Sequence, residues 1–296
     1  MFCLKRIKLY ITSFNFELSH NTAFLNELKN YYFWCNIISK QAMDYINGFL
    51  LISAGVAAGF INTLAGSGSL LTLPLLIFLG LSPHQANATN RVAIFFQNIV
   101  AVKSFTKQKL LVPKQETGLV VPALLGAIVG ASLAVNINET VLHAFIAGLL
   151  FFMFFIILLK PDRWVKEQAG KIDGKRPVWQ IVIFFFVGVY GGFIQAGVGF
   201  FLLSALALGV GYDLIKANAV KVLIVLSYTV IALGIFIWSG QVDFLYGIVL
   251  AAGSSIGAYI ASKYAKQIGT KIIRYILLAA VLLASMKIAG VFELIF

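Results

Sequence analysis

The sequence has 296 residues, of which 60% are hydrophobic and 11% are charged, and its formal net charge is +12 at pH 7. Soluble globular chains carry about 25% charged residues, so this composition excludes a soluble domain and indicates a polytopic membrane protein. The positive charge does not indicate nucleic-acid binding, because the Lys and Arg residues lie in short loops between apolar runs, where they determine membrane orientation.

Residues 1–42 differ from the rest of the chain. They are mixed in character and Asn-rich, contain no apolar run of membrane length and show no cleavage site of a signal peptide. Met43 directly precedes the first long apolar run. We therefore predict that residues 1–42 are a disordered tail or an extension upstream of the natural start.

Eight apolar segments follow, and they predict an all-α, polytopic helical membrane protein with about eight transmembrane segments. The first and the fifth are too long for one crossing, because about 36 helical residues span about 54 Å while the hydrocarbon core is about 30 Å thick. The segments are 45–81, 86–102, 117–136, 140–159, 178–212, 217–238, 243–262 and 272–290.

The two long segments open two similar halves of the chain. The first contains "GFINTLAGSGS" at 59–69 and the second contains "GFIQAGVGF" at 192–200. The tripeptide Ala-Asn-Ala then recurs around Asn87 and Asn218, at nearly the same distance downstream. Ordered matches in two sets of four segments indicate an internal duplication, which is common in transporter folds. We predict a first repeat at 43–160, a basic cytoplasmic linker at 161–177 and a second repeat at 178–296.

Loop charges predict the topology of these repeats. Loops 103–114, 160–177 and 263–274 are each rich in Lys and Arg, so all three are expected on the cytoplasmic side. A single crossing by 178–212 would place the last two loops on opposite sides of the membrane. We therefore predict that this segment enters and returns as a broken or re-entrant helix pair, and that 45–81 does the same. The two repeats are then inverted relative to each other.

The glycine motifs lie where a membrane helix would otherwise continue. Non-helical backbone at this depth is tolerated only inside protein or beside a watery cavity. A half-helix that begins near Ser67 would direct its unpaired N–H groups at the break, and with the hydroxyls of Ser67, Ser69 and Thr63 it would form an anion site. Close packing of glycine and serine against a neighbouring helix is the alternative interpretation.

Each half carries one cation within the apolar segment that follows its glycine motif. Arg91 and Lys221 follow the two Ala-Asn-Ala tripeptides by a few residues, and no acidic residue nearby is an obvious partner for either. A charge at this depth is costly and usually has a functional partner, so a bound anion is one candidate. Snorkelling of the long side chain to the interface is the alternative.

Other chemistries are not indicated. The lone residues His84 and His143 lack the clustering that a metal site needs, and the two cysteines, Cys3 and Cys35, supply no ligands to the spans. Ala65 stands where a Gly-x-Ser-Gly protease motif would have glycine, and the phosphate-binding motif Gly-Lys-Ser/Thr is missing. We predict no enzyme activity, no cofactor and no metal.

Over residues 43–290 the chain resembles the sulfite exporter TauE/SafE family of membrane permeases. The resemblance is carried by "GFINTLAGSGSLLTLPLLIFLGLSPHQANATNRVA" in the first half and "GGFIQAGVGFFLLSALALGVGYDLIKANAVKV" in the second. It implies a multi-pass protein of the bacterial inner membrane that moves small anions, notably sulfite and organosulfur acids. Phe200 and Phe201 stand where the first motif has small residues, so the second half-site is expected to be more apolar.

The motifs and the resemblance together predict a permease that works by alternating access, with a small anionic substrate and the lipid bilayer as its partners. A passive anion channel, or an accessory membrane protein that docks a cytoplasmic partner through the basic linker, is the alternative. The predicted substrate-binding residues are Asn62, Thr63, Gly66, Ser67, Gly68, Ser69, Asn87, Asn90, Arg91, Gln195, Gly197, Gly199, Asn218 and Lys221.

Overall fold

The computed structural model describes residues 45–158 and 177–265. The chain divides into two compact units, Met1–Phe49 and Leu50–Phe296; only the first turn of one helix is described in the former, and the following sections concern the latter. The described residues form helices and no β-strand, which confirms the predicted all-α class. Four of these helices are long and apolar enough to span a membrane. The predicted segment 272–290 lies outside the described residues.

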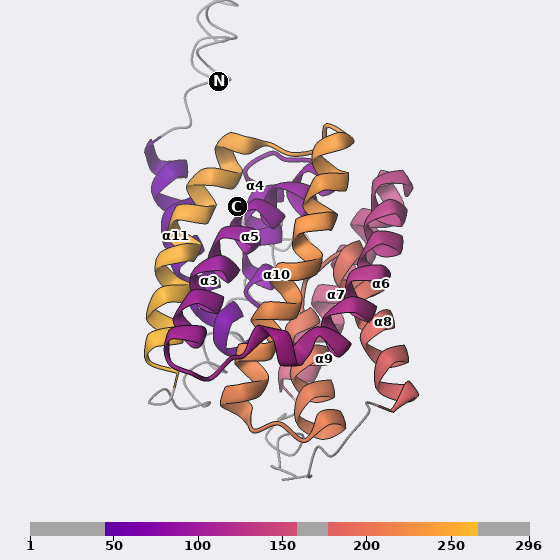
Figure 1. The fold of residues 1–296 in the computed structure, drawn as a ribbon. Coiled ribbons are helices and arrows are strands. Elements are labelled where there is room, and N and C mark those ends of the chain that lie inside the picture. Colours follow the sequence, from indigo (N-terminus) through magenta and orange to yellow (C-terminus); the bar gives the residue numbers. More distant parts are fainter. Residues whose placement is uncertain (1–44, 159–176, 266–296) are drawn as a thin grey trace, which may run out of the picture. The chain divides into compact units, whose positions relative to one another are not determined.

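The same order of helices occurs twice (Figure 1). In each half a broken helix pair is followed by a long helix and then by a further helix. The first half contains α3 (Tyr45–Ala65), α4 (Ser69–Phe78), α5 (Pro83–Lys107), the 3-10 turn η1 (Pro113–Glu116), α6 (Thr117–Asn136) and α7 (Glu139–Leu158). The second contains α8 (Val178–Phe193), α9 (Val198–Ser204), the π-helical segment η3 (Ala205–Val210), α10 (Leu214–Trp238) and α11 (Phe244–Lys263).

Both long central helices begin with strong local signals. Ser82 caps α5 in a reciprocal capping box with Gln85, and Pro83 occupies the first helical position, where its missing N–H costs nothing. The carboxylate of Asp213 accepts hydrogen bonds from two backbone N–H groups at the start of α10. These caps fix where the helices that follow each break begin, and so fix which residues of α5 and α10 lie beside the breaks.

The predicted breaks are present in both long apolar segments. In the first, α3 ends at Gly66, whose positive φ of 75° is the left-handed conformation in which glycine commonly ends helices. The chain then turns back, and the backbone of Gly68 packs directly on the carbonyl of Ala58 in α3. In the second, the side chain of Gln180 near the start of α8 donates a 2.9 Å hydrogen bond to the carbonyl of Gly209 in η3. The two ends of 178–212 therefore lie side by side, as the loop charges predict.

Glycine stripes join helices from different halves of the chain. In α6 and α8, the backbone of Gly130 contacts the carbonyl of Val189, and that of Gly192 contacts the carbonyl of Ala127. A Cβ atom at either glycine would lie within 2.3 Å of that oxygen. Helices approach this closely only where both lack bulky side chains. The first half therefore contributes α6 to a tight pair with α8 of the second half.

The equivalent pair joins α3 to α11. A Cβ atom at Gly59 would lie 2.0 Å from the carbonyl oxygen of Ser254, and one at Gly257 would lie 2.0 Å from that of Val56. Figure 1 shows α3 and α11 together on one side and α6 and α8 together on the other, with α5 and α10 between them. The two predicted repeats thus exchange helices instead of packing as separate bundles.

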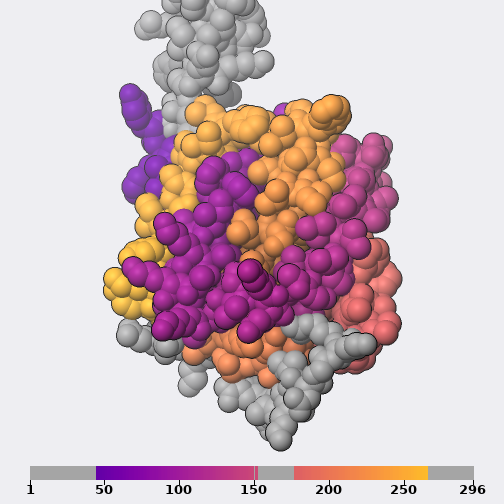
Figure 2. All heavy atoms as spheres, in the orientation of Figure 1, coloured from indigo at the N-terminus to yellow at the C-terminus, as the bar shows by residue number. Residues whose placement is uncertain are grey.

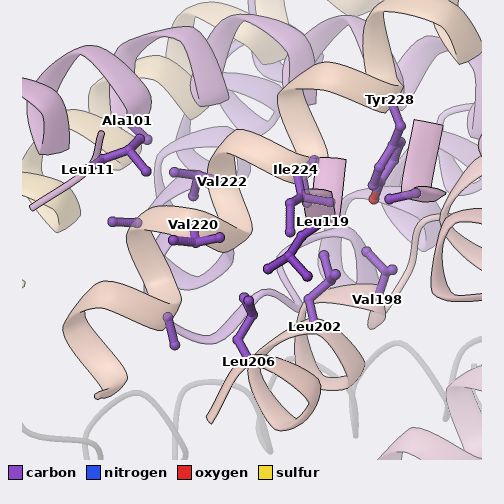
Figure 3. Packing of buried hydrophobic residues seen from close by; sticks show 14 of the residues in the cluster. Ala101, Leu111, Leu119, Val198, Leu202, Leu206, Val220, Val222, Ile224 and Tyr228 are labelled. Atoms are coloured by element: carbon purple, nitrogen blue, oxygen red, sulfur yellow. The ribbon is translucent and has the colours of Figure 1, made fainter. Parts of the chain in front are cut away.

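On the face shown in Figure 2, atoms of α5 and α10 lie between those of α11 on the left and α8 on the right. The larger hydrophobic cluster brings Leu119 of α6 and Ile224 of α10 against Val198, Leu202 and Leu206 of the short α9–η3 segment (Figure 3). Both halves of the chain thus contribute to one core. The inverted orientation of the repeats, their boundaries and the cytoplasmic location of the three basic loops stay predictions.

Candidate functional site

The two helix breaks cross each other at two glycines. The backbone N–H of Gly199 donates a 3.0 Å hydrogen bond to the carbonyl of Gly66. A Cβ atom at Gly199 would lie 2.0 Å from the Cα atom of Gly66, and one at Gly66 would lie 2.2 Å from the Cα atom of Gly199. No side chain fits at either position. The corresponding glycines of the two sequence motifs therefore form the crossing itself.

Lys221 of α10 holds the end of the broken helix α3. Its ammonium group donates to the backbone carbonyls of Asn62 and Thr63, both at 2.9 Å, and to the side-chain oxygen of Asn218 at 2.8 Å. The lysine is 1% exposed, and these three bonds use all three of its N–H donors. A cation at a helix C-terminus is favourable because the last carbonyls carry partial negative charge.

Arg91 of α5 holds the end of the other broken helix, α8. Its Nη2 donates to the carbonyl of Gly192 at 2.6 Å, and its Nη1 donates to the carbonyl of Gly191 and to Oε1 of Gln195, both at 3.1 Å. The guanidinium also lies over the ring of Phe236, 4.7 Å from the centroid. Each half of the chain thus supplies a buried cation that caps the broken helix of the other half.

The structure shows which groups bind the two buried cations, for which the sequence offers no acidic partner. In the described part of the chain, both cations are bound by carbonyl and amide oxygens, and neither forms a salt bridge. Snorkelling does not occur, because Arg91 and Lys221 are 0% and 1% exposed. Their two positive charges therefore remain without a carboxylate in contact. Direct contact of either cation with a substrate stays a prediction.

Unpartnered polar atoms gather at the start of α4. The helix begins without a side-chain cap, and the buried hydroxyl of Ser67, just before it, has no hydrogen-bond partner among the described residues. Asn90 of α5 lies against the first turn of α4, where its Oδ1 accepts a 2.6 Å hydrogen bond from the hydroxyl of Thr72. Its Nδ2 is buried and has no partner in the described part of the structure. Two buried donors that have no partner among the described residues therefore lie near the N-terminus of α4.

The second break is built differently. Gln195 adopts a positive φ of 62°, which is uncommon for a residue with a side chain, and its Oε1 is held by Arg91. The ring of Tyr190 packs edge-on against that of Phe201, and its hydroxyl donates to the carbonyl of Ala196. Aromatic side chains therefore lie at the second break, and the more apolar half-site stays a prediction.

The structure brings the predicted site residues together in two groups. Those at the first break lie near Ser67, and those at the second lie near Gln195. Several have their polar groups engaged within the protein: the Thr63 hydroxyl donates to the carbonyl of Gly59, Asn87 donates to the carbonyl of Phe193, and Asn218 accepts from Lys221. Binding of a substrate by any predicted residue stays a proposal.

Some buried polar residues escaped the sequence analysis. Gln97 and Tyr228 each have a side-chain atom without a partner in the described residues, and Tyr228 packs directly on Gly191 beside Arg91. Gln97 lies ten residues after Asn87, and Tyr228 lies ten residues after Asn218. Extending the alignment of the two halves by three helical turns would therefore have found both of them.

One buried carboxylate also escaped it. Glu116, at the start of α6, is 2% exposed and accepts hydrogen bonds of 2.8 and 3.0 Å from the hydroxyl of Tyr212. In the sequence it lies between the basic loop 103–114 and the apolar segment 117–136, and no role was predicted for it. Among the described residues, no three His, Cys, Asp or Glu side chains are close enough to hold a metal ion.

Comparison with known proteins identifies a family profile and several relatives that match the chain. The sequence profile described as "Sulfite exporter TauE/SafE" matches residues 51–288. The chain is 28% identical to the probable membrane transporter protein ORF9 of a Sinorhizobium species over 233 residues, which cover 79% of this chain and 88% of that protein. It is also 28% identical to the probable membrane transporter protein YfcA of Escherichia coli K12, with coverage of 76% and 83% respectively.

A third relative matches over a longer alignment. The probable membrane transporter protein YjnA of Bacillus subtilis is 27% identical over 261 residues, which cover 80% of this chain and 98% of that protein. No solved structure matches the chain. The bacterial relatives and the membrane-length apolar helices together indicate a multi-pass protein of the bacterial inner membrane. Because the family profile covers most of its length, this chain belongs to the sulfite exporter TauE/SafE family of membrane transporters.

Proposed function

We propose that this protein carries small oxyanions of sulfur, sulfite or organic sulfonates, across the membrane by alternating access. The family and the named relatives support a membrane transporter, and the sulfur oxyanion follows from the description of the family. The observation that carries the anionic character is the start of α4, where the donors of Ser67 and Asn90 are buried without acceptors among the described residues, beside a helix N-terminus that has no side-chain cap.

An anion at this position would replace its lost hydration with protein donors. It would accept hydrogen bonds from the Ser67 hydroxyl and the Asn90 amide and lie in the positive field of the α4 N-terminus. The ammonium of Lys221 is engaged by the carbonyls of Asn62 and Thr63, only a few residues before Ser67, so it supports the end of α3 and does not bind the anion itself.

Removing the Ser67 hydroxyl tests the site. Ser67→Ala is expected to weaken sulfite binding roughly tenfold, because a hydrogen bond to a charged group contributes about 1.5 kcal/mol or more. Without sulfite the variant should be at least as stable as the parent protein, since the deleted hydroxyl has no partner in the part of the chain that the structure describes. The measurement is the sulfite-dependent rise of the thermal midpoint in detergent, together with uptake of labelled sulfite into proteoliposomes.

Ser227→Ala is the matched control, because Ser227 bonds only within its own helix, to the carbonyl of Leu223, and it should bind sulfite as the parent does. Asn90→Asp provides a second variant: it retains an oxygen for the Thr72 hydroxyl but replaces the free donor with negative charge, so transport should fall at least about tenfold. Unchanged sulfite binding in both site variants would refute the site.

Counterflow of labelled sulfite then separates a carrier, which shows trans-acceleration, from a passive channel, which does not.

A further inference from the structure

The exchange of helices between the two halves determines which parts of the molecule can move against each other. We propose that the bodies that rock during transport are not the two sequence repeats but two mixed bundles. The first bundle consists of α3, α4, α5 and α11, and the second of α6, α8, α9, η3 and α10. This inference rests on the alternating-access mechanism proposed above, and it assigns the moving parts within it.

The glycine seams hold each mixed bundle together. Along α6 and α8, Gly130 contacts the carbonyl of Val189 so closely that a Cβ atom would lie 1.9 Å from that oxygen. The seam between α3 and α11 is equally close, with Gly257 against Val56. Backbones in such contact interlock like ridges in grooves, and packed interfaces have discrete arrangements instead of sliding continuously. A motion of repeat against repeat would have to break both seams at once.

Other contacts complete the two bundles. In the first, α11 packs extensively on α5, and α4 packs on α5 through the hydrogen bond from Thr72 to Asn90. In the second, α10 packs on α6, and α9 and η3 contact α8 and α10. Each mixed bundle thus contains one complete broken helix pair, the long helix that follows it, and the fourth helix of the opposite half.

The polar contacts between the bundles concentrate at the helix breaks. The Gly66–Gly199 hydrogen bond, the bonds from Arg91 to the end of α8 and those from Lys221 to the end of α3 all cross from one bundle to the other. Elsewhere α5 and α10 share the larger apolar cluster, to which Phe105 and Ile224 contribute, and apolar contacts of this kind can separate without leaving polar groups unpaired. The breaks are therefore the pivot, and the helix ends move most.

Two residue pairs distinguish the mixed bundles from the repeats. The first is Gln108 and Ser262, joined by a 3.0 Å hydrogen bond from the Gln108 side chain to the Ser262 carbonyl. This pair links the two repeats but lies within one mixed bundle. The second is His84 and Ile137, where the His84 ring nitrogen lies 3.1 Å from the Ile137 carbonyl. This pair lies within the first repeat but links the two mixed bundles.

The experiment cross-links each pair in the full chain. Cys3 and Cys35 are changed to serine, cysteines are placed at either 108 and 262 or 84 and 137, and a short bis-methanethiosulfonate reagent joins them in proteoliposomes. We expect the 84–137 cross-link to stop sulfite transport, with recovery after reduction, and the 108–262 cross-link to leave most of it. The reverse pattern would overturn the proposal, because it is the pattern that rigid repeats would give.

Spin labels at the same four positions decide the question independently of transport. Distances are measured by pulsed electron paramagnetic resonance in lipid bilayers without substrate. The 84–137 pair should give a broad or two-peaked distribution and the 108–262 pair a single narrow one. Narrow distances in both pairs, or a broad distribution only for 108–262, would refute the mixed bundles. Loss of transport in the reduced parent protein would instead refute the proposed function and leave this second measurement valid.

Discussion

Gly199→Ala is expected to prevent most of the protein from folding. The added methyl group would lie 2.0 Å from the Cα atom of Gly66, so the two breaks would have to separate by more than an ångström and lose their backbone hydrogen bond. Overpacking of a rigid interior costs about 1–3 kcal/mol and sometimes more, and both partners here are backbone, which cannot change rotamer. The measurements are the yield of monodisperse protein in detergent and its thermal midpoint.

Gly234→Ala is the matched control for this change. Gly234 also lies in the second half, within α10, and a Cβ atom there would meet nothing within 4 Å. Alanine is favoured over glycine in a helix by about 1 kcal/mol, so this variant should be as stable as the parent or more so. The same chemical change thus has opposite expected effects at two positions. Equal yields and midpoints for both variants would show that the breaks do not cross as described.

Lys221→Met is expected to lower the stability of the protein strongly without weakening its affinity for an anion. Methionine fills a similar volume but donates no hydrogen bonds, so the Thr63 carbonyl and the Asn218 side-chain oxygen lose the partner that Lys221 provides. A buried acceptor left unsatisfied costs about 1–3 kcal/mol. The thermal midpoint should therefore fall, while the rise caused by saturating sulfite should keep its size in the folded fraction.

Lys216→Met is the control, because Lys216 is on the same helix but lies over the ring of Tyr212 and caps neither broken helix; its midpoint should change little. Lys221→Met is expected to lower stability and leave sulfite binding unchanged, whereas Ser67→Ala is expected to weaken sulfite binding and leave stability unchanged. The two variants therefore separate structural support from substrate binding. If Lys221→Met were stable but no longer bound sulfite, Lys221 would be a substrate ligand and its role as a helix cap would be wrong.

Much of the fold could be predicted from the sequence, because membrane thickness and loop charge are strong constraints. Loops 160–177 and 263–274 can share one side of the membrane only if 178–212 crosses an even number of times, and the hydrogen bond between Gln180 and Gly209 shows that the two ends of this segment lie side by side. The sequence also predicts a half-helix that begins near Ser67, because glycines and hydroxyls at membrane depth indicate a break in a membrane helix. In the structure, α4 begins at Ser69.

The partners of the buried cations could not be predicted in this way. The sequence offers no nearby acidic side chain as a partner, so a bound anion and snorkelling of the side chain were the two candidate explanations. The structure supplies backbone carbonyls instead, and these become available only where a helix ends. Which helix end reaches Lys221 depends on packing between residues more than 150 positions apart. Local patterns do not contain that information.

The helix exchange did leave a signal in the sequence. Four Gly-x-x-x-Gly pairs, beginning at Gly55, Gly126, Gly188 and Gly253, lie one in each of the four seam helices. This spacing is typical of closely packed membrane helices. The pattern indicates that tight pairs exist, but it does not say which helices pair, and that choice appears only in the three-dimensional contacts.

The same exchange has a consequence for biosynthesis. Once α7 has left the ribosome, the whole first half has entered the membrane, yet α3 still lacks α11 and α6 still lacks α8. Domains generally fold as units in the order of synthesis, but here the first half has no complete unit to fold. The glycine-lined faces of α3 and α6 therefore lack their partner helices in the bilayer until α8 and α11 have been inserted. The amino-terminal half completes its folding only when the carboxyl-terminal half is present.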